Sequence, residues 1–432
     1  MADTIKVGLL GCGIVGGATA RILRDHADDL RERAGAPIEV AGVAVRSPSK
    51  PRAVELDPSM VTTDPWEVVH DPSIDIVVEA IGGIEPARDL IIEALKSGKH
   101  VVTANKELMS TLGREVMDAA EHSGVDLLFE GSVGGGIPII RPMKESLAGD
   151  RVRRVTGIVN GTTNFILTRM SETGESFAES LAEAEHLGYT ELDPSADIEG
   201  YDAAAKLAIL ASLAFNARVV AGDVHREGIS RISASDISAA HDLGYEVKLL
   251  AVAEKDDEGK ISARVHPSML PRTHPLAAVR DVFNAVFVEA QEVGELMFFG
   301  RGAGGGPTGS AVVGDIVEIA RNIATGGRSP GCTCYQDQAH IRAPDEARVR
   351  YYIVLSVVDE PGVLSAVAGV FARHDVSIAS VRQEGFGAEA TLVLITHSAT
   401  EGDHQATFKE LAKLDVVDGI ASTMRVEGTS ER

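Results

Sequence analysis

The sequence has few cysteines, a deficit of basic residues and no long apolar run, and each shortage excludes a class of protein. Lys and Arg number 41 against 64 Asp and Glu, a formal net charge of −23, which argues against a broad nucleic-acid surface because neutralising phosphates requires a basic face. No run approaches about 18 apolar residues, so no transmembrane helix is expected. The first ten residues lack the basic segment and cleavage site of a signal peptide. Three cysteines are too few for a disulfide framework, so we expect a protein of the reducing cytoplasm.

What remains is the composition of an ordinary globular protein. Hydrophobic residues make up 44% and charged residues 24% of the 432 residues. At about 150 residues per domain, this length predicts two to four domains. Strand-like and helix-like segments alternate over residues 5–130, a pattern typical of a doubly wound α/β domain with a parallel sheet.

A glycine motif opens the chain. Residues 5–10 form an apolar run, as expected of a central parallel strand, and lead through a Gly-x-Gly-x-x-Gly motif into a predicted helix over residues 17–30. Gly11 would allow a tight turn, Gly13 would let the backbone approach a pyrophosphate, and Gly16 would let the helix pack close to the strand. The helix N-terminus, with Ile14 and Val15, would then face the anion. A plain glycine-rich turn is the alternative, but the strand before it and the helix after it favour a dinucleotide site.

The residues after the second predicted strand bear on which dinucleotide binds. This strand, residues 38–45, is followed by Arg46 and Lys50, where an NAD-binding protein usually carries an acidic residue on the ribose hydroxyl. Arg46 could pair with a 2′-phosphate, which favours NADP; NAD and a solvated basic loop remain the alternatives. A later strand, residues 100–103, ends in Thr103, which is a candidate cofactor-binding residue. Lys106 lies just past it, at the sheet edge where ligands bind in such folds.

An acidic segment in the middle of the chain ends in one lysine. Residues 184–206 carry several carboxylates before Lys206, and residues 207–215 are apolar and helix-forming. Asp202 and Lys206 would therefore share one face of a helix. A surface ion pair worth roughly a few tenths of a kcal/mol is the simplest interpretation. A lysine beside an apolar wall and among carboxylates can instead exchange a proton, as a hydride transfer between an alcohol and a nicotinamide requires.

This segment resembles the signature of the homoserine dehydrogenase family. The matching residues are Ala184, Gly188-Tyr189-Thr190, Asp193-Pro194, Asp197-Ile198, Gly200, Asp202 and Lys206. The resemblance also covers residues 78–83, 103–106, 129–140, 160–164 and 302–308. Together these segments extend over residues 1 to about 320 in the family's order, which is far more specific than any single motif.

The resemblance implies the NAD(P)-linked interconversion of L-homoserine and L-aspartate 4-semialdehyde, in the biosynthesis of threonine, methionine and isoleucine. It implies that Lys206 donates the proton to the aldehyde oxygen and that Lys106 assists at the substrate and cofactor. It also implies that Glu191 and Asp202 hold the amino and hydroxyl ends of the substrate.

The same resemblance implies further ligands and a second copy of the chain. Gly188 and Gly302 would contribute to the cofactor site. A loop after the strand at residues 126–130 resembles the family's monovalent-cation site, built largely of backbone carbonyls, and we expect sodium there. The residues of this site would be Glu130, Val133, Gly135 and Ile137. The middle region resembles the family's dimerisation domain, which implies a homodimer or a higher homo-oligomer.

The C-terminal part resembles an amino-acid-sensing module, the ACT domain. Residues 350–414 are predicted to follow a β-α-β-β-α order, with a Val-Asp-Glu-Pro-Gly-Val-Leu signature at residues 358–364. This implies feedback control, with L-threonine as the expected effector; a structural dimerisation appendage is the alternative. In the linker before it, Cys332 and Cys334 cannot complete a structural zinc site alone. They are interpreted as incidental, with redox switching as the alternative.

We therefore expect an α/β protein in three parts. A Rossmann-like NAD(P)-binding domain with a doubly wound parallel sheet would occupy residues 1–130 and be completed by a returning helix at residues 308–323. An α+β catalytic and dimerisation domain would occupy residues 131–320. A ferredoxin-like ACT regulatory domain, residues 347–432, would follow a linker at residues 324–346.

Two alternatives to this function have specific requirements. A dehydrogenase that forms an acyl phosphate needs a cysteine nucleophile, but Cys12 lies in the cofactor loop and the other two cysteines lie in the linker. A non-catalytic amino-acid sensor on a dinucleotide-binding fold would have no need of the lysines and carboxylates of the middle segment.

Overall fold

The computed structural model describes residues 3–52, 54–190, 193–385 and 390–428. The chain forms two compact units, each assembled from three stretches of sequence. Unit 1 comprises Met1–Gly161, Asp202–Val224 and Val282–Ala339. Unit 2 comprises Thr162–Tyr201, His225–Asp281 and His340–Arg432.

A six-stranded parallel sheet lies at the centre of the N-terminal part of unit 1. In spatial order its strands are β3 (Val61–Thr62), β2 (Ile38–Ala44), β1 (Ile5–Leu10), β4 (Ile76–Glu79), β5 (His100–Thr103) and β6 (Leu127–Leu128). Every residue of β4 is buried, as expected of a parallel strand covered on both faces. The strand order reverses beside β1, which is the arrangement of a doubly wound dinucleotide-binding sheet. The predicted fold class is confirmed.

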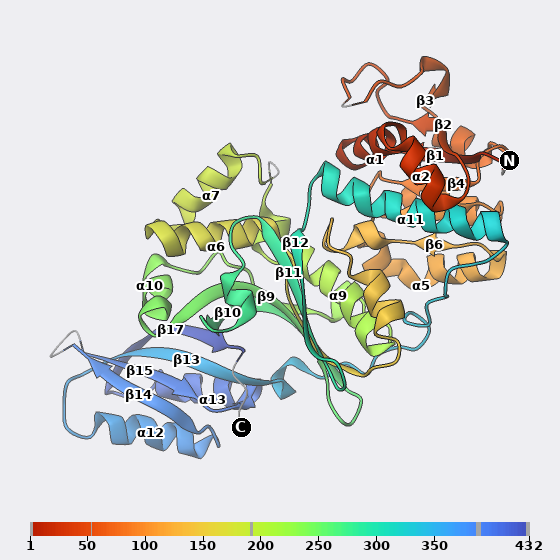
Figure 1. Cartoon of the computed structure of the whole chain (residues 1–432). Helices are drawn as coiled ribbons and strands as arrows, with labels where there is room; N and C mark the ends of the chain where they lie inside the picture. The colour runs from red at the N-terminus through yellow and green to blue at the C-terminus, as the bar shows by residue number, and fades with distance from the viewer. Residues whose placement is uncertain (1–2, 53, 191–192, 386–389, 429–432) are drawn as a thin grey trace. The chain divides into compact units, whose positions relative to one another are not determined.

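Two N-terminal helices and one late helix share the core of this sheet (Figure 1). These helices are α1 (Ile14–Asp25), α2 (Ala27–Ala34) and α11 (Gly305–Thr325). The single helix expected over residues 17–30 is instead α1 and α2, divided at His26. The helix expected at residues 308–323 is α11, and it packs tightly on α1, because a Cβ on Gly309 would lie 3.0 Å from the Cβ of Ala18.

The rest of unit 1 completes the sheet and adds an antiparallel layer. Three further helices accompany the parallel sheet: α3 (Pro65–His70), α4 (Ala87–Lys96) and α5 (Lys106–Ser123). The antiparallel layer consists of β7 (Val152–Ile158), β11 (Phe283–Ala290) and β12 (Gly294–Arg301). Unit 1 also holds most of α9 (Tyr201–Phe215), in which nearly all residues are buried, as expected of a helix that is apolar all round. Short helical turns complete it: η1 (Pro58–Met60), η2 (Glu130–Ser132), η3 (Pro142–Ser146) and η4 (Ala221–Asp223).

Unit 2 contains an extended sheet with helices. In spatial order the strands are β9 (Tyr245–Lys255), β10 (Ile261–Pro271), β17 (Val417–Val426), β13 (Arg348–Val357), β15 (Thr391–Thr396) and β14 (Ile378–Glu384). The short strands β8 (His225–Arg226) and β16 (Ala399–Thr400) pair with β10 and β13. Its helices are α6 (Gly161–Thr173), α7 (Phe177–His186), α8 (Ser195–Ile198), α10 (Ala234–Asp242), α12 (Val363–Arg373) and α13 (Glu401–Leu411), with the turns η5 (Pro275–Ala278) and η6 (Pro344–Glu346). Helix α6 begins at Gly161, directly after Asn160.

The C-terminal module, residues 347–432, has its own apolar core within unit 2. Its order is β13, α12, β14, β15, α13 and β17, and its strands lie in the order β17-β13-β15-β14. This β-α-β-β-α-β succession is that of the ferredoxin-like fold. The sequence prediction ended at the last helix and missed β17, which completes the sheet and also pairs in parallel with β10.

Two further features bear on the sequence-based expectations. Cys332 and Cys334, which the sequence analysis interpreted as incidental, are joined by a disulfide in the segment after α11. Cys12 is a free, buried thiol in the glycine loop. Of the helices in the described ranges, none has the length and apolar character to cross a membrane.

Candidate functional site

Two lysines converge on one buried carboxylate in unit 1. Lys106 donates to Oδ1 of Asp202, and Lys206 donates to Oδ2 at 2.7 Å. Asn160 Nδ2 also donates to Oδ2 of Asp202, at 2.9 Å. The carbonyl of Val159 accepts a second hydrogen bond from Lys206 at 2.7 Å. The structure therefore unites three residues that the sequence assigned to catalysis and substrate binding, and adds Asn160.

The backbone explains how these side chains meet. Lys106 is the first residue of α5, whose start is fixed by Asn105, because the Asn105 side chain accepts from the backbone N–H of Leu108 at 3.0 Å. Asp202 and Lys206 lie one turn apart on α9, as predicted. Val159 and Asn160 directly follow β7. Three segments far apart in sequence thus contribute to one cluster.

The cluster has a buried side and a solvent-exposed side. The Asp202 side chain is only 5% exposed and that of Lys206 11% exposed, whereas the Lys106 side chain is 44% exposed. Burial alone would raise the pKa of Asp202, but the ammonium groups of Lys206 and Lys106 outweigh it and hold that pKa below its ordinary value. The carboxylate therefore stays ionised, and the half-exposed Lys106 forms the open side of the cluster.

The glycine loop has the geometry of a dinucleotide cradle. Gly11 adopts φ +98°, and a Cβ on Gly16 would lie 2.1 Å from the carbonyl oxygen of Gly11, so neither position accepts a larger residue. A Cβ on Gly13 would meet nothing within 4 Å, which leaves open space at the N-terminus of α1. Ile14, 79% exposed there, and the half-buried Val15 lie where a cofactor would approach. These residues fit a pyrophosphate.

Arg46 and Lys50 lie on an exposed loop after β2. The sequence analysis missed the residue that shapes this loop, Arg52. Its guanidinium donates to the carbonyls of Ser47, Pro48 and Lys50 at 2.6–2.9 Å. Its charge also acts on the thiol of Cys12 in the glycine loop, where it opposes the rise in pKa that burial causes. No motif in the sequence points to Arg52, because its role depends on the folded loop.

Other predicted cofactor and substrate residues are distributed over both units. Thr103 is fully buried in unit 1, where its hydroxyl donates to Glu79 at 2.6 Å. Gly302 is buried in the same unit, and a Cβ there would lie 1.9 Å from Asn284. Gly188 follows α7 in unit 2 with φ +74°. Glu191 lies outside the described residues.

The Glu130 side chain in the predicted cation loop accepts hydrogen bonds from the backbone. Its two oxygens accept hydrogen bonds from the N–H groups of Ile139, Ile140 and Arg141 at 2.6–2.9 Å. Its own N–H donates to Asp315 at 2.8 Å. Burial, with the Glu130 charge nearby, raises the pKa of Asp315 to about 8. The Glu130 carboxylate therefore holds the loop together.

Backbone carbonyls are the remaining oxygen donors of this loop. Val133, Gly135 and Ile137 are buried. Hard cations prefer such oxygen ligands. Within the described ranges, no group of three His, Cys, Asp or Glu side chains is arranged to hold a metal. Backbone carbonyls are therefore the oxygen ligands that this loop offers to a cation.

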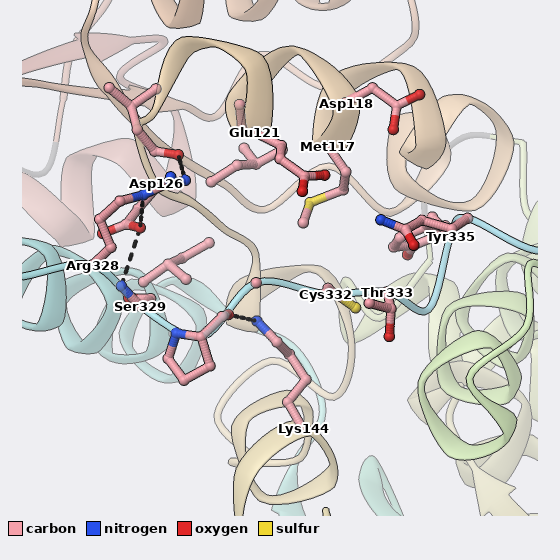
Figure 2. A pocket seen from close by; sticks show the side chains of 17 residues that line it. Met117, Asp118, Glu121, Asp126, Lys144, Arg328, Ser329, Cys332, Thr333 and Tyr335 are labelled. Carbon is pink, nitrogen blue, oxygen red and sulfur yellow. Dashed lines mark hydrogen bonds and ion pairs between the residues drawn. The ribbon is translucent and has the colours of Figure 1, made fainter.

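A cavity of about 420 Å³ lies elsewhere in unit 1. Figure 2 shows Glu121 of α5 and Lys144 reaching into it from opposite walls, with Cys332 between them. Burial lowers the pKa of Lys144, and its ammonium donates to the carbonyl of Pro330 at 3.3 Å. None of the predicted site residues lines this cavity.

Comparison with known proteins identifies the family of this chain. A homoserine dehydrogenase of Mycobacterium tuberculosis is 50% identical to this chain over 435 residues, covering 98% of each. The chain belongs to the homoserine dehydrogenase family. A second member, from Corynebacterium glutamicum, is 50% identical over 431 residues. The match covers 98% of this chain and 96% of the Corynebacterium protein.

Family models assign the same parts. The homoserine dehydrogenase model matches residues 138–317, and the NAD-binding domain of homoserine dehydrogenase matches residues 11–130. The ACT domain model matches residues 351–416, so the C-terminal module contains an ACT domain. The predicted family, the nicotinamide dinucleotide domain and the ACT domain are confirmed.

Solved structures agree with these matches. The homoserine dehydrogenase of Thiobacillus denitrificans superposes with a TM-score of 0.92 at 41% identity, covering 98% of each chain. A hyperthermophilic archaeal homoserine dehydrogenase in complex with NADPH superposes with a TM-score of 0.65 at 29% identity, covering 76% of this chain and 100% of its own. The family member described here is an oxidoreductase, which favours the enzyme over the non-catalytic sensor.

Proposed function

We propose that this enzyme interconverts L-homoserine and L-aspartate 4-semialdehyde, with NADP as its dinucleotide. The observation that carries the proposal is the cluster of Lys106, Asp202 and Lys206. A family member that keeps an ionised carboxylate between two lysines has the groups that a carbonyl–alcohol conversion requires.

Each lysine of the cluster has a separate role in the proposed reaction. The nicotinamide, when bound, supplies or accepts the hydride. Lys206 holds the proton that the aldehyde oxygen takes up during reduction, and it receives that proton back when the alcohol is oxidised. Its position is fixed by Asp202 and the Val159 carbonyl at 2.7 Å each. Lys106, at the open side, stabilises the negative charge that develops on the substrate oxygen.

Asp202 serves both the lysines and the substrate. A carboxylate has about four acceptor sites, and the two lysines and Asn160 use three of them. The remaining site suits a hydroxyl or ammonium donor of the substrate. Glu191 is proposed to bind the amino end of the substrate.

The preference for NADP rests on the basic loop after β2. Arg46 and Lys50 would read the 2′-phosphate, and Arg52 keeps their loop folded through three carbonyls. The NADPH found in the archaeal relative supports the same choice. Gly188 and Gly302 are proposed to contact the cofactor, and Thr103 to support the sheet edge beneath it.

A sodium ion is proposed at the carbonyls of Val133, Gly135 and Ile137, beside Glu130. A homodimer is proposed as the working form. The edge strand β12 supports this, because Met297 and Phe299 on it are 36% and 55% exposed. L-Threonine is proposed as the effector of the ACT domain, and the cytoplasm as the location.

Cofactor absorbance at the nicotinamide band tests the function. Purified enzyme with L-homoserine and NADP⁺ should reduce the cofactor, and L-threonine should suppress the rate. Lys206→Ala should lower kcat by about 100- to 10,000-fold, because an acid–base group typically contributes 10²–10⁴, while cofactor affinity stays near that of the wild type. The matched control is Lys96→Ala, at an exposed position on α4, which should retain full activity. A Lys206→Ala enzyme with near-normal kcat would refute the assignment.

A further inference from the structure

Arg425 connects the C-terminal module to a segment outside it. It lies on β17, is 6% exposed, and donates to both oxygens of Glu401 in the module at 3.1 Å. Tyr351 of β13 also donates to Glu401, at 2.8 Å. On its other side, Arg425 makes a two-pronged contact with Glu227 at 2.8 Å for each bond. Glu227 directly follows β8 and is 198 residues away in sequence.

Glu227 is bonded to β10, and the two residues after it contact the segment at residues 195–201. Its N–H donates to the Val265 carbonyl of β10 at 2.8 Å. The next residue, Gly228, approaches that segment so closely that a Cβ on it would lie 2.4 Å from the Ile198 carbonyl oxygen. Ile229 donates to the same carbonyl at 2.8 Å.

An aromatic contact strengthens this attachment. The Arg226 guanidinium lies 3.7 Å from the ring centre of Tyr201, within the range of a cation–π interaction. Tyr201 is the first residue of α9, and Asp202 is the next. The chain between Arg425 and the start of the catalytic helix therefore consists of direct contacts within unit 2.

We propose that the Arg425–Glu227 ion pair is the connection through which an amino acid bound to the ACT domain controls residues 195–201 and hence Asp202. The inference rests on the proposed function, because it needs a turnover that an effector controls. A paired guanidinium–carboxylate contact is directional. Because Arg425 is buried, losing both glutamates would leave its charge buried without a partner, which is strongly unfavourable. A displacement of β17 or α13 is therefore passed to Glu227.

The Arg425–Glu227 pair should be needed for inhibition by the amino acid but not for its binding. A ligand changes an equilibrium only by its differential affinity for the two states. Without the Arg425–Glu227 contact, the ACT domain should still bind its amino acid, but segment 195–201 should no longer respond. Binding and inhibition should separate in a variant that breaks this pair alone.

Glu227→Gln in the full-length enzyme makes this test. The Glu227 side chain is 44% exposed and Arg425 keeps Glu401, so the variant should fold, which its melting temperature checks. We expect kcat and KM without effector within about twofold of wild type, and the Kd for L-threonine by titration calorimetry within about threefold. The ratio of the rate without L-threonine to the rate at saturating L-threonine should be at least fivefold smaller than in the wild type. Arg425→Lys, which keeps the charge but not the two-pronged contact, should act in the same direction.

Glu172→Gln is the matched control. Glu172 pairs with Arg280 within unit 2, its side chain is 40% exposed, and neither residue belongs to the C-terminal module. This variant should be inhibited like the wild type. A Glu227→Gln enzyme that is inhibited to the full depth would overturn the inference, as would a wild-type enzyme whose rate no protein amino acid changes.

Hydrogen exchange separates failure of the inference from failure of the proposed function. L-Threonine should change exchange at residues 195–201 in the wild type but not in Glu227→Gln, and this measurement needs no turnover. If the wild type does not oxidise L-homoserine, the proposed function fails, and the exchange result alone decides the coupling. Equal exchange changes in both proteins would overturn the coupling even in an active enzyme.

Discussion

Replacing Asp202 with Asn tests whether the charge of one carboxylate organises both lysines. The substitution keeps the shape of the side chain but removes its charge and turns one oxygen into an amide donor. That donor would face Lys106 on one side, or Lys206 and Asn160 on the other, where the wild-type carboxylate accepts from all three. Whichever way the amide turns, a donor meets a donor.

The magnitude follows from these contacts. Hydrogen bonds to charged groups contribute about 1.5–3 kcal/mol, against about 1 for neutral pairs, so the buried Lys206 contact should lose about 1 kcal/mol. Lys106 is 44% exposed, so its contact should lose only about half as much. The facing donors cost about 1–2 kcal/mol more. The total of about 2.5–3.5 kcal/mol corresponds to a roughly 50- to 500-fold loss in kcat.

Steady-state kinetics with L-homoserine, together with NADPH fluorescence titration, measures this effect. The cofactor Kd should stay within about twofold of the wild type, because the glycine loop is untouched. Asp118→Asn is the matched control, since Asp118 also pairs with a basic residue one turn away, Arg114, at 3.5 Å on the exposed face of α5. Its kcat should not change. An Asp202→Asn enzyme within about threefold of wild-type kcat would refute the role given to the carboxylate.

Three further predictions address the cofactor and the core. Gly16→Ala should weaken NADPH binding at least tenfold, because its Cβ would lie 2.1 Å from the Gly11 carbonyl oxygen, whereas Gly149→Ala, with nothing within 4 Å, should leave the fluorescence titration unchanged. Arg46→Ala should raise KM for NADPH about tenfold and leave KM for NADH alone; equal changes in both would contradict the 2′-phosphate role. Burial, aided by two nearby arginines, lowers the pKa of His266 to about 3. The neutral form is thus favoured in the fold, and stability falls as pH drops below about 6.5, by about 2 kcal/mol at pH 5 at about 1.4 kcal/mol per pH unit; urea unfolding should show a flatter pH profile in His266→Asn.

Local patterns in the sequence predicted the elements well where the pattern is short and repetitive. The apolar run at residues 5–10 is β1, with the same bounds. The four-residue spacing of Asp202 and Lys206 placed them on one helix face, and they do form an ion pair. Such features depend on neighbours along the chain, which the sequence shows directly.

Contacts between distant segments could not be predicted in this way. Lys106 and Asp202 are 96 residues apart, and no periodicity says which strand end meets which helix; only the family resemblance suggested a shared site. Asn160 stands in an Asn-Gly pair, which by itself is only a turn signal, whereas in the structure its side chain donates to the Asp202 carboxylate. Arg52 was missed because its role depends on a folded loop rather than on a motif.

The packing of α11 against α1 determines when unit 1 can finish folding during synthesis of the chain. Residues 1–161 cannot complete unit 1 until α11, starting at Gly305, has been made. At about 5–20 residues per second, the ribosome needs roughly 15–60 s to reach it after β1 has emerged. During that interval the nascent sheet lacks the cover that Val312 and Ile316 later provide. A chain truncated before α11 should therefore leave this apolar surface uncovered and aggregate rather than form an active enzyme.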